Sequence, residues 1–188
     1  AQEPTCGPSR ASILTGLRPD SSRVFDIFTP IRTVRPNVLT LPQHFRQNGY
    51  TTLSLGKIYH HKTEDDALGW SRPAWKAPLL NSRGYLKEEN IARINSIGNS
   101  SFYERMEVPD TAYEDGMTAQ KAIETLRALK GQTNPFFLAV GFFKPHLPFI
   151  APEKYWRLYD PGRIEIPAPY AFPADRFRAN YNYGGEVS

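Results

Sequence analysis

Residues 118–142 read TAQKAIETLRALKGQTNPFFLAVGF, and from this stretch we infer the fold class. Its first half, 118–129, repeats apolar side chains at helical spacing and carries charged side chains on the other face. Lys130 and Gly131 are typical of a helix end. The apolar run 135–142 that follows predicts a strand buried on both faces of a sheet. A helix, a short loop and a buried strand in this order predict an α/β protein.

Basic side chains follow this strand and one other strand of the predicted sheet. Lys144 and His146 come directly after the run 135–142. A second β-rich run, 50–55, is followed by Lys57 and the pair His60-His61. Open α/β sheets hold their ligands at the carboxyl ends of strands, so both groups are candidate site residues. The alternative for Lys57 and the two histidines is a set of basic side chains on an exposed loop.

A third candidate segment lies near the N-terminus, where residues 6–16 read Cys-Gly-Pro-Ser-Arg-Ala-Ser-Ile-Leu-Thr-Gly. Pro8 suits the start of a helix and Gly16 suits its end. Cys6 is therefore predicted at a helix N-terminus, where free N–H groups favour an anion, and Arg10 adds a positive charge one turn later. The alternative is a buried or helix-capping free cysteine, the commoner fate of a lone Cys. The predicted apolar face of this helix is Ala11, Ile13 and Leu14.

These three stretches together resemble the sulfatase family. Residues 6–16 match C-x-P-S-R followed by L-T-G, and residues 56–60 match G-K-x-x-H after a strand. Residues 139–149 read A-V-G-x-x-K-P-H-x-P-F, which is similar to the iduronate-2-sulfatase branch of that family. The resemblance covers most of the chain and is weakest at residues 62–110. It implies the alkaline-phosphatase-like α/β fold, a large mixed β-sheet between helices.

The resemblance also implies that residues 1–188 are an internal piece of a longer protein. They correspond to part of the N-terminal sulfatase catalytic domain. The family's strand with paired metal-binding aspartates lies upstream of C-x-P-S-R, and its later Asp-His or Asp-Asn segment lies downstream of residue 188. We therefore expect this piece to be inactive alone.

The resemblance implies that Cys6 becomes the nucleophile and that two cofactors act there, namely formylglycine made from Cys6 and a calcium ion. In sulfatases a maturation enzyme oxidises this cysteine to formylglycine (3-oxoalanine), whose hydrate attacks the sulfate ester. A calcium ion binds that hydrate and a sulfate oxygen, which makes position 6 a metal ligand as formylglycine. Arg10 and Lys57 would hold the hydrate and the sulfate by charge-assisted hydrogen bonds.

Four further residues take roles by the same resemblance. His146 would be the general acid that protonates the leaving sugar oxygen, and His60 the base that allows sulfate to leave. Lys144 and Arg23 would bind the sulfate or a substrate carboxylate. The implied substrate is the 2-O-sulfate of terminal iduronate in a glycosaminoglycan. The alternatives are a phosphate or phosphonate ester hydrolase on the same fold and a non-catalytic relative that binds anionic glycans.

Composition narrows the remaining function classes. The 188 residues are enough for one domain with a sizeable core, and no apolar run is long enough to span a membrane. A single cysteine excludes an internal disulfide framework. The net charge of +4 favours anionic partners, but the absence of a compact Lys/Arg run argues against nucleic acid. The family resemblance implies a periplasmic, secreted or lysosome-like location.

The rest of the chain yields structural predictions. Residues 17–26 form an irregular run with a Pro-Asp turn, and the loop around Trp70 and Trp75 folds back on the body. Adjacent Asp65 and Asp66 are solvated loop charges rather than metal ligands. His44 has no chemical role. Three short helices are expected, namely one between a Thr40 N-cap and Gly49, one at 87–93 and one at 153–159.

Overall fold

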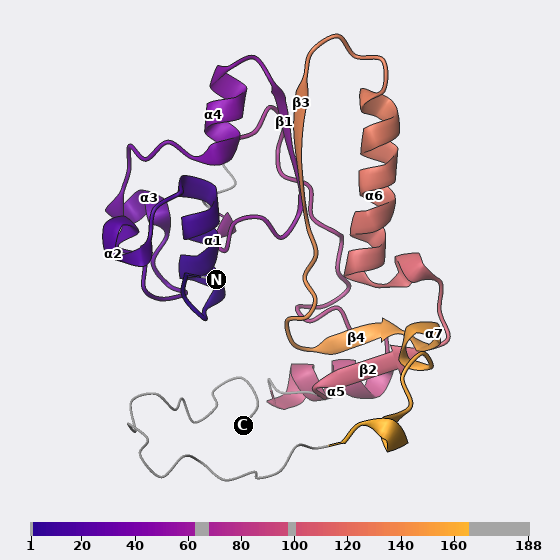
Figure 1. Ribbon diagram of the computed structural model, residues 1–188. Coiled ribbons are helices and arrows are strands. Elements are labelled where there is room, and N and C mark those ends of the chain that lie inside the picture. The colour runs from indigo at the N-terminus through magenta and orange to yellow at the C-terminus, as the bar shows by residue number, and fades with distance from the viewer. Residues whose placement is uncertain (1, 63–67, 98–100, 166–188) are drawn as a thin grey trace, which may run out of the picture. The chain divides into compact units, whose positions relative to one another are not determined.

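The computed structural model describes residues 2–62, 68–97 and 101–165 (Figure 1). The chain divides into two compact units. The first contains the residues up to Pro78 together with Glu114–Phe143, and the second contains Leu79–Tyr113 together with the residues from Lys144 onward. The predicted loop charges Asp65 and Asp66 lie outside the described residues. Within the described ranges, every helix is too short or too polar to cross a bilayer.

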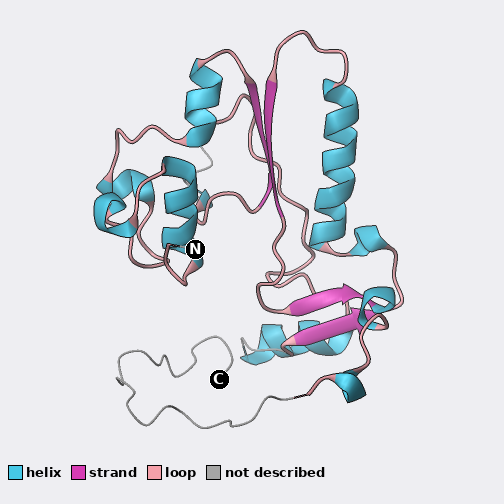
Figure 2. Cartoon of the chain, in the orientation of Figure 1, coloured by secondary structure: helices cyan, strands magenta, loops and turns pink. Residues whose placement is uncertain are grey.

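Two parallel strands form the centre of the first unit. β1 (Thr51–Gly56) pairs with β3 (Phe136–Gly141) along its whole length, with Gly56 opposite Gly141. Helix α6 (Glu114–Leu129) lies along one side of the strands, and α1 (Cys6–Thr15) and α4 (Leu41–Gln47) lie on the other side (Figures 1 and 2). The core on the α1 side gathers Leu14, Tyr59 and Trp70 around β3 side chains. This arrangement confirms the predicted α/β class.

The loop around Trp70 does fold back, and it follows the free edge of β1. The Trp75 N–H donates to Ser54 O at 2.9 Å, and the Gly56 N–H donates to Trp75 O at 2.9 Å. Trp70 itself is only 2% exposed. The prediction that the strand at 135–142 is buried on both faces is wrong for the described residues. There β3 pairs with β1 on one edge alone, and its side chains are half-buried or exposed.

Helix α1 starts at Cys6, two residues before the predicted start at Pro8, with Thr5 as its N-cap and Gly16 at φ 71° after its last residue. Cys6 therefore lies at the helix N-terminus, as predicted. Ala11 and Leu14 are buried, but Ile13 is 70% exposed, so its predicted place on the apolar face is wrong. Ile13 lies two residues from Ala11, about 200° around the helix, and therefore points the opposite way.

The segments after α1 are short. Residues predicted as an irregular run include the single-turn helix α2 (Pro19–Ser22), followed by α3 (Ile31–Val34). Helix α4 has the predicted Thr40 as N-cap residue, but the Thr40 hydroxyl makes no capping hydrogen bond. Gly49 follows α4 at φ 84°, and His44 is exposed, in line with its lack of a chemical role.

The second unit contains a second pair of parallel strands, β2 (Tyr103–Met106) and β4 (Phe149–Pro152). Sequence analysis missed both, because four residues are too few to show a period. The predicted helix at 87–93 is α5 (Glu88–Ile97), and the one predicted at 153–159 is the shorter α7 (Glu153–Trp156). The described residues of this unit also include two short 3₁₀ turns, η2 (Asp110–Ala112) and η3 (Pro161–Arg163).

A buried carboxylate organises this second unit. Glu104 is 1% exposed, and it accepts hydrogen bonds from the main-chain N–H groups of Leu86 and Lys87. The side chains of Asn90 and Tyr113 also donate to it, both at 2.9 Å. Burial and the Glu104 carboxylate raise the pKa of Tyr113 above its ordinary value, so the phenol stays a donor. Four donors compensate the cost of burying this charge.

Candidate active site

The site begins where β1 and β3 end. Gly56 and Gly141 are the last residues of the two strands, and the Lys57 N–H continues the pairing by donating to Gly141 O at 2.8 Å. A Cβ on Gly56 would collide with Gly141 O, and a Cβ on Gly141 would collide with Lys57 O. Glycine at both positions therefore allows the two backbones to approach and directs Lys57 and the residues after it out of the sheet.

Cys6 lies at the first turn of α1 and is half-buried. Its Sγ is 3.2 Å from Nδ1 of His60, although the two residues are 54 positions apart in sequence. The helix N-terminus and the segment after β1 thus meet as predicted. His60 packs edge-on against His61, with ring centroids 4.9 Å apart and an interplanar angle of 80°.

Arg10 connects the same two segments. One guanidinium nitrogen donates to Lys57 O at 2.7 Å and to Ile58 O at 2.8 Å. Burial lowers the pKa of Arg10, and the nearby Cys6 side chain opposes that shift, but an arginine stays charged at any physiological pH. Arg10 therefore holds the main chain of residues 57–58 against α1 while its charge remains close to Cys6.

The third basic group of the site is Lys57, which is half-buried. Its Nζ lies over the ring of Phe143, 4.6 Å from the ring centroid, at the distance of a cation–π contact. The Phe143 N–H in turn donates to Oδ1 of Asp115 in the first turn of α6, at 2.7 Å. The structure therefore brings Cys6, Arg10 and His60 together, and it joins Arg10 to the main chain of Lys57.

The other predicted residues are placed differently. Lys144 and His146 belong to the second unit. The Lys144 ammonium donates to Pro148 O at 2.7 Å and to His146 O at 3.2 Å. His146 Nδ1 is 2.8 Å from Leu147 O, so in the neutral ring Nδ1–H donates there and Nε2 carries the lone pair. Arg23 is exposed, at φ 64° after α2. The roles of these three residues stay predictions.

The described groups around position 6 fit one of the two predicted cofactors, the hydrated aldehyde, but do not by themselves supply a calcium site. A hydrated aldehyde presents hydroxyls, and here it would meet an imidazole nitrogen, a guanidinium charge and the amides of a helix N-terminus, which fit it. Calcium needs six to eight oxygen ligands. The residues that the structure describes contain no group of three or more His, Cys, Asp or Glu side chains able to hold a metal. They do not form a calcium site by themselves.

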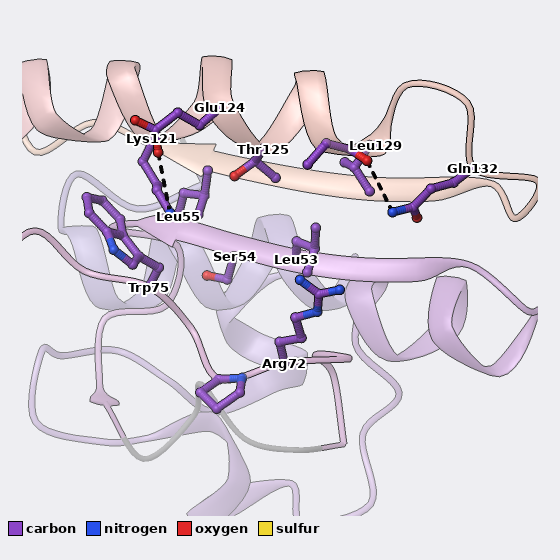
Figure 3. Close-up of a pocket in the computed structure, with 12 residues that line it drawn as sticks. Leu53, Ser54, Leu55, Arg72, Trp75, Lys121, Glu124, Thr125, Leu129 and Gln132 are labelled. Atoms are coloured by element: carbon purple, nitrogen blue, oxygen red, sulfur yellow. Dashed lines mark hydrogen bonds and ion pairs between the residues drawn. The ribbon is translucent and has the colours of Figure 1, made fainter.

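A pocket of about 370 Å³ lies away from this site, between α6 and the segment along β1 (Figure 3). Trp75, Leu53 and Leu129 line it, together with a Lys121–Glu124 ion pair of 3.5 Å. None of the predicted site residues lines this pocket, so its size does not mark it as the place of the chemistry.

Sequence analysis missed two residues that support the site. Phe143 and Asp115 were given no role there. A signal for Asp115 existed, because an acidic residue is typical of a first helical turn. The predicted helix began at 118, whereas α6 begins at Glu114 and so places Asp115 in that turn.

The sulfatase family model matches residues 1–181 of this chain. The chain belongs to the sulfatase family. It is 35% identical to human iduronate 2-sulfatase over 174 residues, which cover 88% of this chain and 31% of that protein. A sulfatase of Formosa agariphila is 31% identical over 181 residues, covering 89% of this chain and 34% of that protein. The sulfatase chain thus spans about a third of the length of these curated relatives.

More distant sulfatase relatives and one solved structure extend the comparison. Choline-sulfatase of Rhizobium meliloti is 27% identical over 187 residues, covering 92% of this chain and 35% of that protein. The phosphonate monoester hydrolase of Agrobacterium radiobacter superposes with a TM-score of 0.54 at 23% identity, covering 86% of this chain and 36% of that one. At this identity the likeness concerns the fold, and it agrees with the predicted alkaline-phosphatase-like α/β class.

Proposed function

We propose that this chain is part of the catalytic domain of an enzyme that hydrolyses sulfate esters on sugars. The observation that carries the proposal is the contact of Cys6 Sγ with His60 Nδ1, beside the guanidinium of Arg10. The preferred substrate is the 2-O-sulfate of terminal iduronate in a glycosaminoglycan. The 35% identity to human iduronate 2-sulfatase supports that choice over other sugar sulfates.

Sulfate-ester hydrolysis requires an in-line nucleophile and neutralisation of the charge on the sulfuryl oxygens. Formylglycine made from Cys6 by a maturation enzyme, together with Ca²⁺, would supply an activated hydroxyl at position 6. The remaining calcium ligands would come from segments that the described residues do not include. The fit of position 6 to a hydrated aldehyde supports the modification.

The residues of this chain supply binding and proton transfer. Arg10 and Lys57 contribute two positive charges at the end of β1, and these charges would hold a sulfate. His60 Nδ1 lies within hydrogen-bond distance of the side chain at position 6, so it is placed to accept a proton from a hydroxyl there. His146 would protonate the leaving oxygen through Nε2, and Lys144 and Arg23 would bind further anionic groups of the substrate.

The proposal also includes a cellular location and binding partners for the protein. The sulfatase relatives and the implied maturation step support a periplasmic, secreted or lysosome-like location. The partners are then a sulfated sugar or glycosaminoglycan and the formylglycine-generating enzyme.

Substrate preference tests the proposal. The full-length protein is produced with a maturation enzyme and assayed on an aryl sulfate, the matching aryl phosphate, and a disaccharide ending in iduronate 2-sulfate. We expect higher kcat/KM on the aryl sulfate than on the phosphate, and release of sulfate from the disaccharide. A preference for the phosphate would instead support the ester-hydrolase alternative, and no turnover of any ester would support a glycan-binding relative.

A further inference from the structure

The ammonium group of Lys57 lies over the face of the Phe143 ring, at 4.6 Å from its centroid. Both side chains are half-buried, so the ring replaces part of the water around the cation. The face of an aromatic ring is negative and attracts a cation, and the attraction grows as water is removed. A lysine side chain has four rotatable bonds, and this contact restricts them.

The two chain segments that carry this pair are fixed to each other by their backbones. The Lys57 N–H donates to Gly141 O at 2.8 Å, and the Lys57 carbonyl accepts from Arg10 at 2.7 Å. The Phe143 N–H donates to Oδ1 of Asp115 at 2.7 Å. The ring and the ammonium therefore start from two anchored positions, at the ends of β1 and β3.

We propose that Phe143 is a positioning residue for Lys57, which orients the Lys57 ammonium toward the sulfate of the substrate. The inference rests on the proposed function, because it requires Lys57 to bind the sulfuryl group. Phe143 does not touch the substrate in this account. Phe143 acts through its contact with Lys57, and Asp115 supports Phe143 by accepting the hydrogen bond from its main-chain N–H.

A double-mutant cycle in the full-length enzyme tests this coupling. Phe143→Leu keeps an apolar side chain and removes the ring face, and we expect kcat/KM on an aryl sulfate to fall roughly 3- to 30-fold. Phe143→Tyr restores the ring face and should restore most of the activity. In a Lys57→Ala background, Phe143→Leu should cause no further loss.

The matched control is Phe142→Leu, the same substitution at the neighbouring residue, whose side chain is 49% exposed. It should leave kcat/KM unchanged. Thermal unfolding and the aldehyde content of the position 6 peptide are measured for every variant. If Phe143→Leu does not fold, Phe143→Met replaces it in the cycle, because methionine is apolar, flexible and lacks a ring face.

The outcomes separate this inference from the proposed function. An equal loss from Phe143→Leu with and without Lys57, or no loss at all while Lys57→Ala is impaired, would overturn the positioning role and leave the proposed function intact. Wild-type turnover by Lys57→Ala would overturn both the role of Lys57 in sulfate binding and the role of Phe143.

Discussion

Replacing Arg10 by lysine keeps the positive charge at the site and removes the geometry that holds residues 57–58. In the structure one guanidinium nitrogen donates to both Lys57 O and Ile58 O. A lysine ammonium is a compact point charge on a flexible stem, so we expect it to hold one of the two carbonyls at most. The main chain that presents Lys57 and His60 would then be free to move away from α1.

The size of this effect follows from the bond that is lost. A hydrogen bond from a charged donor contributes about 1.5–3 kcal/mol. Arg10 is half-buried and water can partly replace the lost bond, so the lower end of that range, about 1.5 kcal/mol, applies. This free energy corresponds to roughly a tenfold smaller equilibrium constant for the aligned over the displaced main chain. We expect kcat to fall in Arg10→Lys, at most by about that factor.

The assay is steady-state hydrolysis of an aryl sulfate by the full-length enzyme, with the aldehyde content of position 6 measured in parallel. Arg18→Lys is the control, because Arg18 is exposed and lies at the start of α2 rather than in the site. Its kcat should not change. Unchanged kcat in Arg10→Lys would refute the argument that the bifurcated contact of Arg10 aligns the segment after β1.

Three further predictions test other parts of the account. Gly141→Ala should lower both stability and activity, because the new Cβ would overlap Lys57 O. The control is Ala139→Gly in the same strand, and a melting temperature and turnover of Gly141→Ala at or above those of the control would contradict this. His146→Ala should lose much of a 10²- to 10⁴-fold factor on a sugar sulfate and far less on an activated aryl sulfate, and equal losses on both would remove its role as general acid. His60→Ala should show a burst of alcohol release followed by slow turnover on either substrate, and a linear trace would argue against its role as base.

Local patterns predicted the longer elements of the first unit, because each of these carries its own signal. The apolar period of α6, the β-rich run of β1 and the glycine after α1 are readable from neighbouring residues. The error at Ile13 came from grouping nearby apolar residues without following the helical angle. The strands β2 and β4 were missed because their pairing joins residues far apart in sequence, and four residues give no period.

Part of the site could be predicted, because functional side chains of α/β proteins gather at the ends of strands and helices. Cys6, Lys57 and His60 were expected at element ends; the structure brings Cys6 into contact with His60 and has Lys57 directly after β1. The contacts of Arg10 with main-chain carbonyls could not be predicted, since no pattern records which carbonyl a guanidinium reaches. The same holds for Phe143 beneath Lys57, because that pair depends on how closely Gly56 and Gly141 approach.

The central claim is that the side chain at position 6 is a modified nucleophile rather than a structural thiol. The most direct test is the mass of the peptide that contains Cys6, from full-length protein produced with a formylglycine-generating enzyme. The account predicts the mass of the aldehyde, a hydrazide adduct at the same residue, and no activity in Cys6→Ala. An unmodified thiol in a preparation that still turns over sulfate esters would contradict it.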